Sequence, residues 1–234
     1  MMKLGILNAC TPQDEIDFDE VEFENFRRFL DSAEHDFQLS EYRITEGDFP
    51  AVGECDAYLI TGSPKGAYDS DEWIKQTADF IRRTYAAKKK MVGICFGHQI
   101  LAHSLGGRAE KSPKGWGMGL QPILVDKTPA WMEPSIDTGD FYFCHQDQVT
   151  QLPDGASLLA GSEFCPNGIF IMGDQVLGMQ LHPEFTDTTM TKTIDYFRDK
   201  LDGDFLEKTD ATLEKEKPEN AIIANWIVNF LANA

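Results

Sequence analysis

Val92–Gln99 reads VGICFGHQ and joins two patterns of different period. The apolar run Met91–Ile94 is typical of a buried strand, whereas Gly97–Ser104 has the spacing of a helix. Cys95 stands at the junction, with glycines two residues before it and two residues after it. Glycines in these places let neighbouring backbone approach closely, as the nucleophile elbow of a strand–turn–helix unit requires. The segment therefore predicts a thiol held on a sharp turn, where the amide dipoles of the following helix favour the thiolate.

Strand and helix patterns alternate before this elbow, and short strand patterns dominate after it. Gly, Pro, Asn and Asp separate the runs, as expected where strands end. This order predicts an α/β fold with a doubly wound, mostly parallel sheet flanked by helices and a smaller antiparallel portion. Besides Met91–Ile94 and Gly97–Ser104, the expected strands are Lys3–Asn8, Phe37–Ile44, Ala57–Ile60, Leu120–Val125, Phe141–Cys144, Ser157–Ala160, Gly168–Met172 and Val176–Leu181, and the expected helices are Asp19–Ala33, Asp71–Ala87 and Thr186–Leu201.

The domain organisation is expected to be simple. Residues 1–205 form one domain, and residues 206–234 form a charged connection and a C-terminal helix on the same domain. The stretch Asp202–Glu219 is rich in charge and poor in apolar residues, so it is expected on the surface. Apolar side chains in Ala221–Leu231 recur at helical spacing and form a wide stripe. We expect this stripe to dock on the core; a contact between two copies in a homodimer is the alternative.

Composition excludes several classes of protein. A chain of 234 residues with 42% hydrophobic residues can build a large core and is not globally disordered. Its 21 Lys and Arg against 39 Asp and Glu give a net charge of −18, which disfavours nucleic-acid and membrane-surface partners. No apolar stretch reaches the roughly 18 residues that span a bilayer. The five cysteines are widely spaced, which argues against a disulfide framework or a zinc ribbon and indicates a reducing, cytoplasmic setting.

A thiolate nucleophile needs a base, and the base needs a partner that orients it. His182 and Glu184 are two residues apart in the sequence QLHPEF, so extended backbone, which Pro183 favours, projects both to one face. A carboxylate there would fix the tautomer of the imidazole and stabilise the imidazolium. Taken separately, the two segments also fit a buried structural cysteine and an ordinary strand end. A metal site is not expected, because Cys95 and His182 lack a third and a fourth ligand.

The sequence GICFGHQ around Cys95, together with HPE at His182–Glu184, resembles the class I (triad) glutamine amidotransferases. The closest variety is the GMP-synthase-like amidotransferases, which include stand-alone γ-glutamyl peptidases. The resemblance covers Leu4–Phe197 and implies a flavodoxin-like, doubly wound α/β domain with no cofactor. It also implies that Cys95 attacks the carboxamide of glutamine, releasing ammonia and leaving a γ-glutamyl thioester, while His182 moves protons and Glu184 orients it.

The resemblance further implies an oxyanion site and a substrate site. Gly62 and Ser63 stand at the place of the family's glycine-rich oxyanion loop, one of whose N–H groups would pair with that of Phe96. The family often has a second glycine where Ser63 stands. Many relatives have Ser or Asn in place of Cys144 and Gly in place of Gln146, so tolerance of larger γ-glutamyl substrates is expected. The residues implied to contact the substrate are Gln99, Cys144, His145, Gln146 and Asp147.

Three functions stay open at this point. The first is a glutaminase that supplies ammonia to a separate synthetase subunit, because the chain has no Walker-type phosphate loop for an ATP-dependent step. The second is a self-sufficient hydrolase of γ-glutamyl amides or peptides, with water as the acceptor. The third is a catalytically silent binding or regulatory module of the same fold. An intact set of triad residues favours an enzyme.

Overall fold

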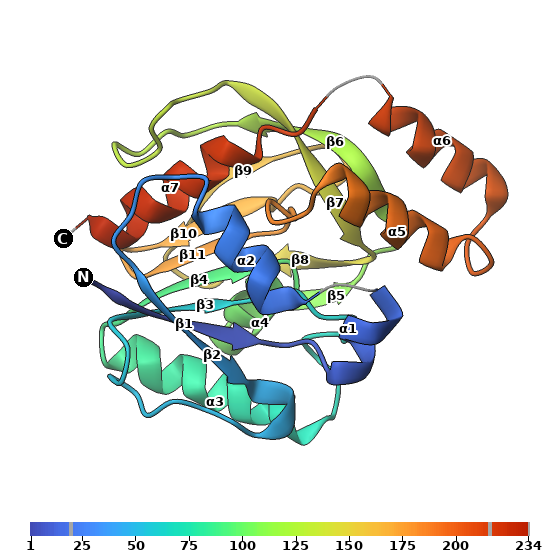
Figure 1. The fold of residues 1–234 in the computed structure, drawn as a ribbon. Coiled ribbons are helices and arrows are strands. Elements are labelled where there is room, and N and C mark those ends of the chain that lie inside the picture. Colours follow the sequence, from blue (N-terminus) through green and yellow to red (C-terminus); the bar gives the residue numbers. More distant parts are fainter. Residues whose placement is uncertain (19–20, 215–216, 234) are drawn as a thin grey trace.

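The protein is described by a computed structural model that covers residues 1–18, 21–214 and 217–233. Within these residues the main sheet has the strand order β2-β1-β3-β4-β11-β10-β9-β6-β7 (Figure 1). Its first five strands are mutually parallel, and the remaining pairings are antiparallel. The expected α/β fold, with a parallel sheet and an added antiparallel portion, is confirmed. The parallel strands are β1 (Lys3–Asn8), β2 (Gln38–Arg43), β3 (Ala57–Ile60), β4 (Lys90–Ile94) and β11 (Val176–Met179).

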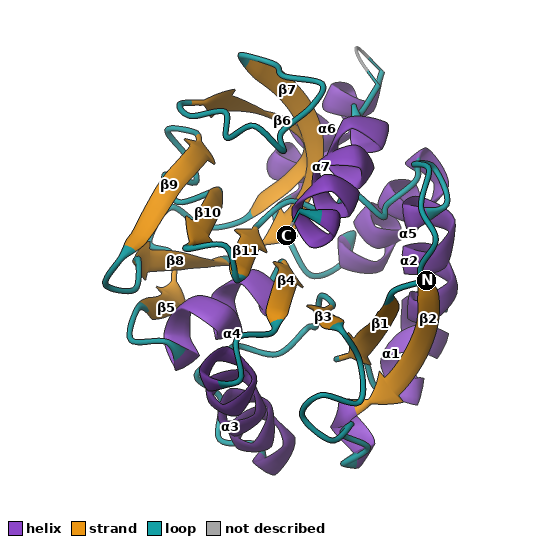
Figure 2. Cartoon of the chain, turned by 90° about the vertical axis from the view of Figure 1, so that its left-hand side faces the viewer, coloured by secondary structure: helices purple, strands orange, loops and turns teal. Residues whose placement is uncertain are grey.

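Helices cover both faces of the parallel strands, which is why β3 and β11 are buried along their whole length. Side chains of one strand alternate between the two faces. Leu59 of β3 packs in the core cluster that contains residues of α2 (Glu22–Leu30) and α7 (Asn220–Ala232). Tyr58 and Ile60 pack in the cluster that contains residues of α3 (Glu72–Ala86) and α4 (Phe96–Ser104). Figure 2 shows these two pairs of helices on opposite sides of the sheet.

The antiparallel portion extends the sheet beyond β11. It contains β10 (Ile169–Met172), β9 (Ala156–Gly161), β6 (Gly117–Val125) and β7 (Thr138–His145). A separate small sheet pairs β5 (Arg108–Lys111) with β8 (Asp147–Gln151). These two strands were not predicted from the sequence, because they are short and carry few apolar residues. In β5 only Ala109 is buried.

In the described residues, two α-helices and a short 3₁₀ helix (Ile44–Glu46) lie where none was expected. α1 (Pro12–Phe18) replaces the loop expected after β1, and its signal was a proline at the first helical position. Residues 19 and 20, the start of the helix expected over Asp19–Ala33, lie outside the described residues. α6 (Gly203–Leu213) occupies much of the expected charged connection. Its N-cap, Asp202, accepts a hydrogen bond from the backbone N–H of Phe205 at 3.2 Å.

The C-terminal helix α7 packs against the rest of the chain. Ile223, Ile227 and Phe230 are at most 1% exposed, and the helix contacts α2. The indole N–H of Trp226 donates to the carbonyl of Pro134 at 2.9 Å. The apolar stripe is therefore covered within the chain itself. None of the helices in the described residues is long and apolar enough to cross a membrane.

Candidate active site

The carboxyl ends of β1, β3, β4 and β11 meet at one edge of the sheet, where doubly wound folds bind their ligands. Cys95 follows β4 there with φ 50° and ψ −101°, a backbone conformation that residues other than glycine rarely adopt. Both flanking glycines are required by packing. A Cβ on Gly93 would lie 2.3 Å from the carbonyl oxygen of Gly97, and one on Gly97 would lie 2.2 Å from that of Ile60. The expected strand–turn–helix unit is therefore formed, with α4 starting at the next residue.

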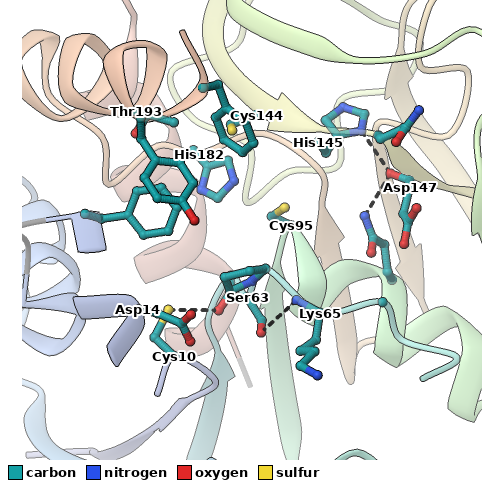
Figure 3. A pocket seen from close by; sticks show the side chains of 18 of the residues that line it. Cys10, Asp14, Ser63, Lys65, Cys95, Cys144, His145, Asp147, His182 and Thr193 are labelled. Carbon is teal, nitrogen blue, oxygen red and sulfur yellow. Dashed lines mark hydrogen bonds between the residues drawn. The ribbon is translucent and has the colours of Figure 1, made fainter. Parts of the chain in front are cut away.

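His182 follows β11 and faces the same pocket as Cys95 (Figure 3). Its backbone N–H donates to the carbonyl of Tyr142 in β7 at 2.8 Å. Its Nδ1 lies 2.6 Å from Oε1 of Glu184, which is 2% exposed. Because a carboxylate only accepts, Nδ1 carries the proton and Nε2 is left for Cys95. The spacing of two residues thus brings the imidazole and the carboxylate together as expected.

The charge state of His182 follows from its neighbours. Burial opposes protonation, but the Cys95 thiolate and the Glu184 carboxylate outweigh it and raise the pKa of His182 well above its usual value. The ring also stacks on Phe185, with 4.2 Å between ring centroids. A protonated, positively charged imidazole is therefore favoured at this position.

The loop after β3 presents its backbone to the pocket. The carbonyl oxygen of Gly62 accepts from the hydroxyl of Thr61 at 3.0 Å and from the thiol of Cys10 at 3.7 Å. In a trans peptide the carbonyl and the next N–H point in opposite directions, so the N–H of Ser63 points away from Thr61 and Cys10. A Cβ on Gly62 would lie 3.0 Å from Cε1 of His182. The contact of Cys10 with this loop was not expected, since nothing in the sequence places Cys10 beside it.

Gln99 and the segment after β7 form the opposite side of the pocket. Nε2 of Gln99 donates to the carbonyl of Asp147 at 2.9 Å and to Oε1 of Gln180 at 3.1 Å, which leaves its oxygen as an acceptor. Nδ1 of His145 donates to the same carbonyl at 2.9 Å. Burial lowers the pKa of His145 to about 3, so its ring is neutral. Its Nε2 is a buried acceptor without a hydrogen-bond partner in the described part of the chain.

The pocket has a volume of about 500 Å³. Of the residues expected at the site, Phe96 and Glu184 are buried and are not among the residues that line the pocket. The others line it: Gly62, Ser63, Cys95, Gln99, Cys144, His145, Gln146, Asp147 and His182. Burial raises the pKa of the Cys144 thiol to about 12. The wall built by α1 and α5 (Asp187–Phe197) was not predicted from the sequence, because these helices carry no recognisable chemical motif.

Comparison with known proteins agrees with this geometry. Residues 16–200 match the family Glutamine amidotransferase class-I. The chain belongs to this family. Gamma-glutamyl peptidase 3 of Arabidopsis thaliana is 32% identical over 207 residues, which cover 83% of this chain and 82% of the relative. The glutamine-hydrolyzing GMP synthase of Porphyromonas gingivalis is 27% identical over 175 residues, which cover 70% of this chain and 33% of the relative.

The fold has a close counterpart among solved structures. A glutamine amidotransferase from Thermotoga maritima superposes over 100% of both chains with a TM-score of 0.80 at 18% identity. The expected family, the fold class and the assignment to an enzyme family are thus confirmed. The roles of individual side chains stay predictions.

Proposed function

We propose that this class I glutamine amidotransferase homologue hydrolyses the γ-amide bond of glutamine or of a γ-glutamyl amide, with Cys95 as nucleophile. The observation that carries the proposal is the pairing of Cys95 with His182, whose Nδ1 is held by Glu184 at 2.6 Å. Nucleophile, base and orienting carboxylate in this order form a complete triad. The gamma-glutamyl peptidase relative supports a hydrolase that acts without a synthetase.

In the first step the Cys95 thiolate forms a bond to the γ-carbonyl carbon. The carbonyl oxygen becomes an oxyanion, for which the N–H groups of Ser63 and Phe96 are the proposed donors. His182 gives its Nε2 proton to the leaving nitrogen, and the C–N bond breaks. Ammonia or an amine departs, and a γ-glutamyl thioester and a neutral imidazole remain.

In the second step water replaces the amine. His182 takes a proton from the water, whose oxygen attacks the thioester carbon. The C–S bond then breaks, and the thiolate is restored beside the imidazolium. The product leaves as the γ-carboxylic acid of glutamate, which gives its remaining proton to solvent and becomes the carboxylate. Gln99 and His145 are proposed to hold the α-amino and α-carboxylate end of the γ-glutamyl group, together with the segment Cys144–Asp147. The acceptor oxygen of Gln99 and the bare Nε2 of His145 are suited to an ammonium group.

The test is glutamate release from glutamine and from a γ-glutamyl dipeptide by the purified chain. We expect Cys95→Ala to lower the rate by at least about 10⁴-fold and His182→Ala nearly as much. Glu184→Gln should retain more activity, because its amide oxygen can still accept from Nδ1. Cys165→Ala, which removes a buried thiol outside the pocket, is the matched control.

The outcomes separate the open functions. Turnover of the dipeptide by the chain alone supports the self-sufficient hydrolase. Ammonia release from glutamine only when cell extract is added supports a glutaminase with a separate synthetase subunit. Turnover unaffected by Cys95→Ala overturns the triad, and the absence of turnover under every condition supports the silent module.

A further inference from the structure

The pocket continues past Cys95 on the side away from Asp147. Figure 3 shows His145 and Asp147 on one side of Cys95, and Asp14 of α1 and Thr193 of α5 on the other. His182 lies toward α5, and its imidazolium must reach the leaving nitrogen. If the γ-glutamyl group lies by His145 and Asp147, as the proposed function holds, the leaving group faces α1 and α5. Ammonia would leave most of that side empty.

A row of aromatic rings lines this second side. The rings of Phe18 and Tyr196 are 4.5 Å apart between centroids, those of Tyr196 and Phe197 are 5.1 Å apart, and those of Phe197 and Trp116 are 4.9 Å apart. All four are half-buried and line the pocket. Aromatic rings bind other flat rings by stacking or edge-to-face contact, beyond the gain from burial. The row therefore suits a leaving group with a ring of its own.

Charge on this side of the pocket is mainly negative. Asp14, Glu15 and Glu22 line it, and Glu15 pairs with Arg43 at 3.2 Å. Within the described residues Asp14 has no cationic partner; its Oδ2 accepts from the N–H and the hydroxyl of Thr11, both at 2.7 Å. Burial, followed by the charges of Glu22 and Asp14, raises the pKa of the Cys10 thiol in this wall well above its usual range.

The positive charge of Lys200 lies beside the middle of the row, near Tyr196 and Phe197. The ammonium of Lys200 sits 3.2 Å from the centre of the Tyr196 ring, on an exposed side chain. A leaving group with a carboxylate could pair with Lys200, whereas one with an ammonium could pair with Asp14. Asp14 is half-buried within the wall, where charges are screened less than at the exposed rim.

We propose that this wall, formed by Asp14, Phe18, Tyr196 and Phe197, is a leaving-group subsite for an amine that carries an aromatic ring, and that it favours a positively charged amine over a negatively charged one. The inference rests on the proposed function and specifies its substrate class. Glutamine would then be a minimal substrate that leaves the subsite empty. A γ-glutamyl amide of a cationic arylalkylamine would fill it.

Four matched γ-glutamyl amides test this, with kcat/KM measured on the full chain. The amide of butylamine is aliphatic and that of benzylamine is aromatic. The amide of 4-(aminomethyl)benzylamine is aromatic and carries a cation, and that of phenylalanine is aromatic and carries a carboxylate. We expect kcat/KM for the benzylamide to exceed that for the butylamide by about 10-fold, which is in the range of discrimination that apolar pocket contacts provide. The cationic amide should exceed the phenylalanine amide by several-fold, and added salt should reduce that ratio.

Matched variants assign the preferences to the wall. Phe18→Leu and Tyr196→Leu should lower the benzylamide-to-butylamide ratio toward one, because they keep apolar volume and remove a ring. Asp14→Asn should lower the ratio of cationic to carboxylate amide. The controls are Phe37→Leu, a half-buried ring outside the pocket, and Asp17→Asn, an exposed acid of α1 bonded to Gln13. Both should keep the wild-type ratios, and thermal unfolding checks that every variant folds.

Equal kcat/KM for the four amides, or a preference for the phenylalanine amide that Lys200→Gln removes, would overturn the subsite while leaving the proposed hydrolase standing. Hydrolysis of neither glutamine nor any amide would overturn the proposed function and the subsite together. Ratios that fall equally in the control variants would show that the wall does not select the substrate.

Discussion

At the residue scale, five similar thiols have been given different environments. Cys95 lines the pocket beside His182. Cys10 and Cys144 line the same pocket, but burial raises the pKa of each thiol, to about 12 for Cys144 and well above its usual range for Cys10. Burial also raises the pKa of Cys165 to about 12. The reactivity of each thiol therefore depends on the residues that surround it in the folded chain.

We expect brief, substoichiometric iodoacetamide at neutral pH to label Cys95 first, because the thiolate is the nucleophile and His182⁺ stabilises it there. Peptide mapping with and without glutamine measures the site, and saturating glutamine should protect Cys95. Label found mainly on Cys144, or label on Cys95 that glutamine does not change, would contradict the proposed site.

Thr61 offers a second test at this scale, as a positioning residue. Its hydroxyl donates to the carbonyl of Gly62 and accepts from the N–H of Ala9, both at 3.0 Å. Thr61→Val keeps the shape and removes these bonds, so the Gly62–Ser63 peptide can rotate. We expect kcat to fall by about 10–100-fold with KM little changed, since an oxyanion donor acts on the transition state. Thr61→Ser should restore kcat; equal kcat in the Val and Ser variants would exclude the positioning role.

At the scale of elements, the elbow depends on close approach between β3, β4 and α4. The N–H of Gly97 donates to the carbonyl of Thr61 at 3.1 Å, and the N–H of Cys95 donates to that of Met179 at 2.9 Å. These bonds tie the start of α4 to the ends of β3 and β11. Gly93 lies against Gly97, and Gly97 lies against Ile60, and these glycines allow β3, β4 and α4 to meet around one thiol.

Gly97→Ala should therefore destabilise the whole domain. Its Cβ would lie 2.2 Å from the carbonyl oxygen of Ile60, and backbone cannot move aside as a flexible side chain can. We expect a loss of about 1–3 kcal/mol in the free energy of unfolding by urea. Gly203→Ala is the matched control, because a Cβ at the start of α6 meets nothing within 4 Å. Equal urea midpoints for the two variants would refute the close contact.

At the scale of the whole molecule, buried histidines link stability to pH. Burial lowers the pKa of His98 and of His145 to about 3, against a usual value of 6.5. Between these values the unfolded chain binds protons that the folded chain does not, so stability falls as pH falls below 6.5. His182 acts in the other direction. Its raised pKa adds stability that is present below pH 6.5 and is lost as pH rises toward the folded value.

The free energy of unfolding should therefore be greatest near neutral pH. Below pH 6.5 each of the two buried histidines should contribute a slope of up to about 1.4 kcal/mol per pH unit. His98→Gln should remove one such contribution, whatever its effect on stability at pH 7. Urea unfolding at several pH values between 5 and 7 measures the slope, and an unchanged slope in His98→Gln would contradict the buried neutral state.

The sequence by itself determined the parallel half of the fold and which side chains, Cys95, His182 and Glu184, follow its strands at one edge. Strands such as Lys3–Asn8 and Ala57–Ile60 were predicted with their observed bounds, because buried parallel strands are continuous apolar runs. Cys95 and the His182–Glu184 pair could be found because local geometry fixes them: a turn between two glycines, and two residues of extended backbone.

Only the tertiary structure decided what surrounds that thiol. β5 and β8 are held by pairing with each other, and α1 and α6 by packing, so their sequences carry weak local signals. The contact of Cys10 with Gly62 joins residues 52 positions apart. The ring of Phe18 on α1 meets that of Tyr196 on α5 only after the chain has closed over the sheet. Local propensity cannot encode such distant contacts, because burial and charge at a pocket wall arise from segments that meet only in the folded chain.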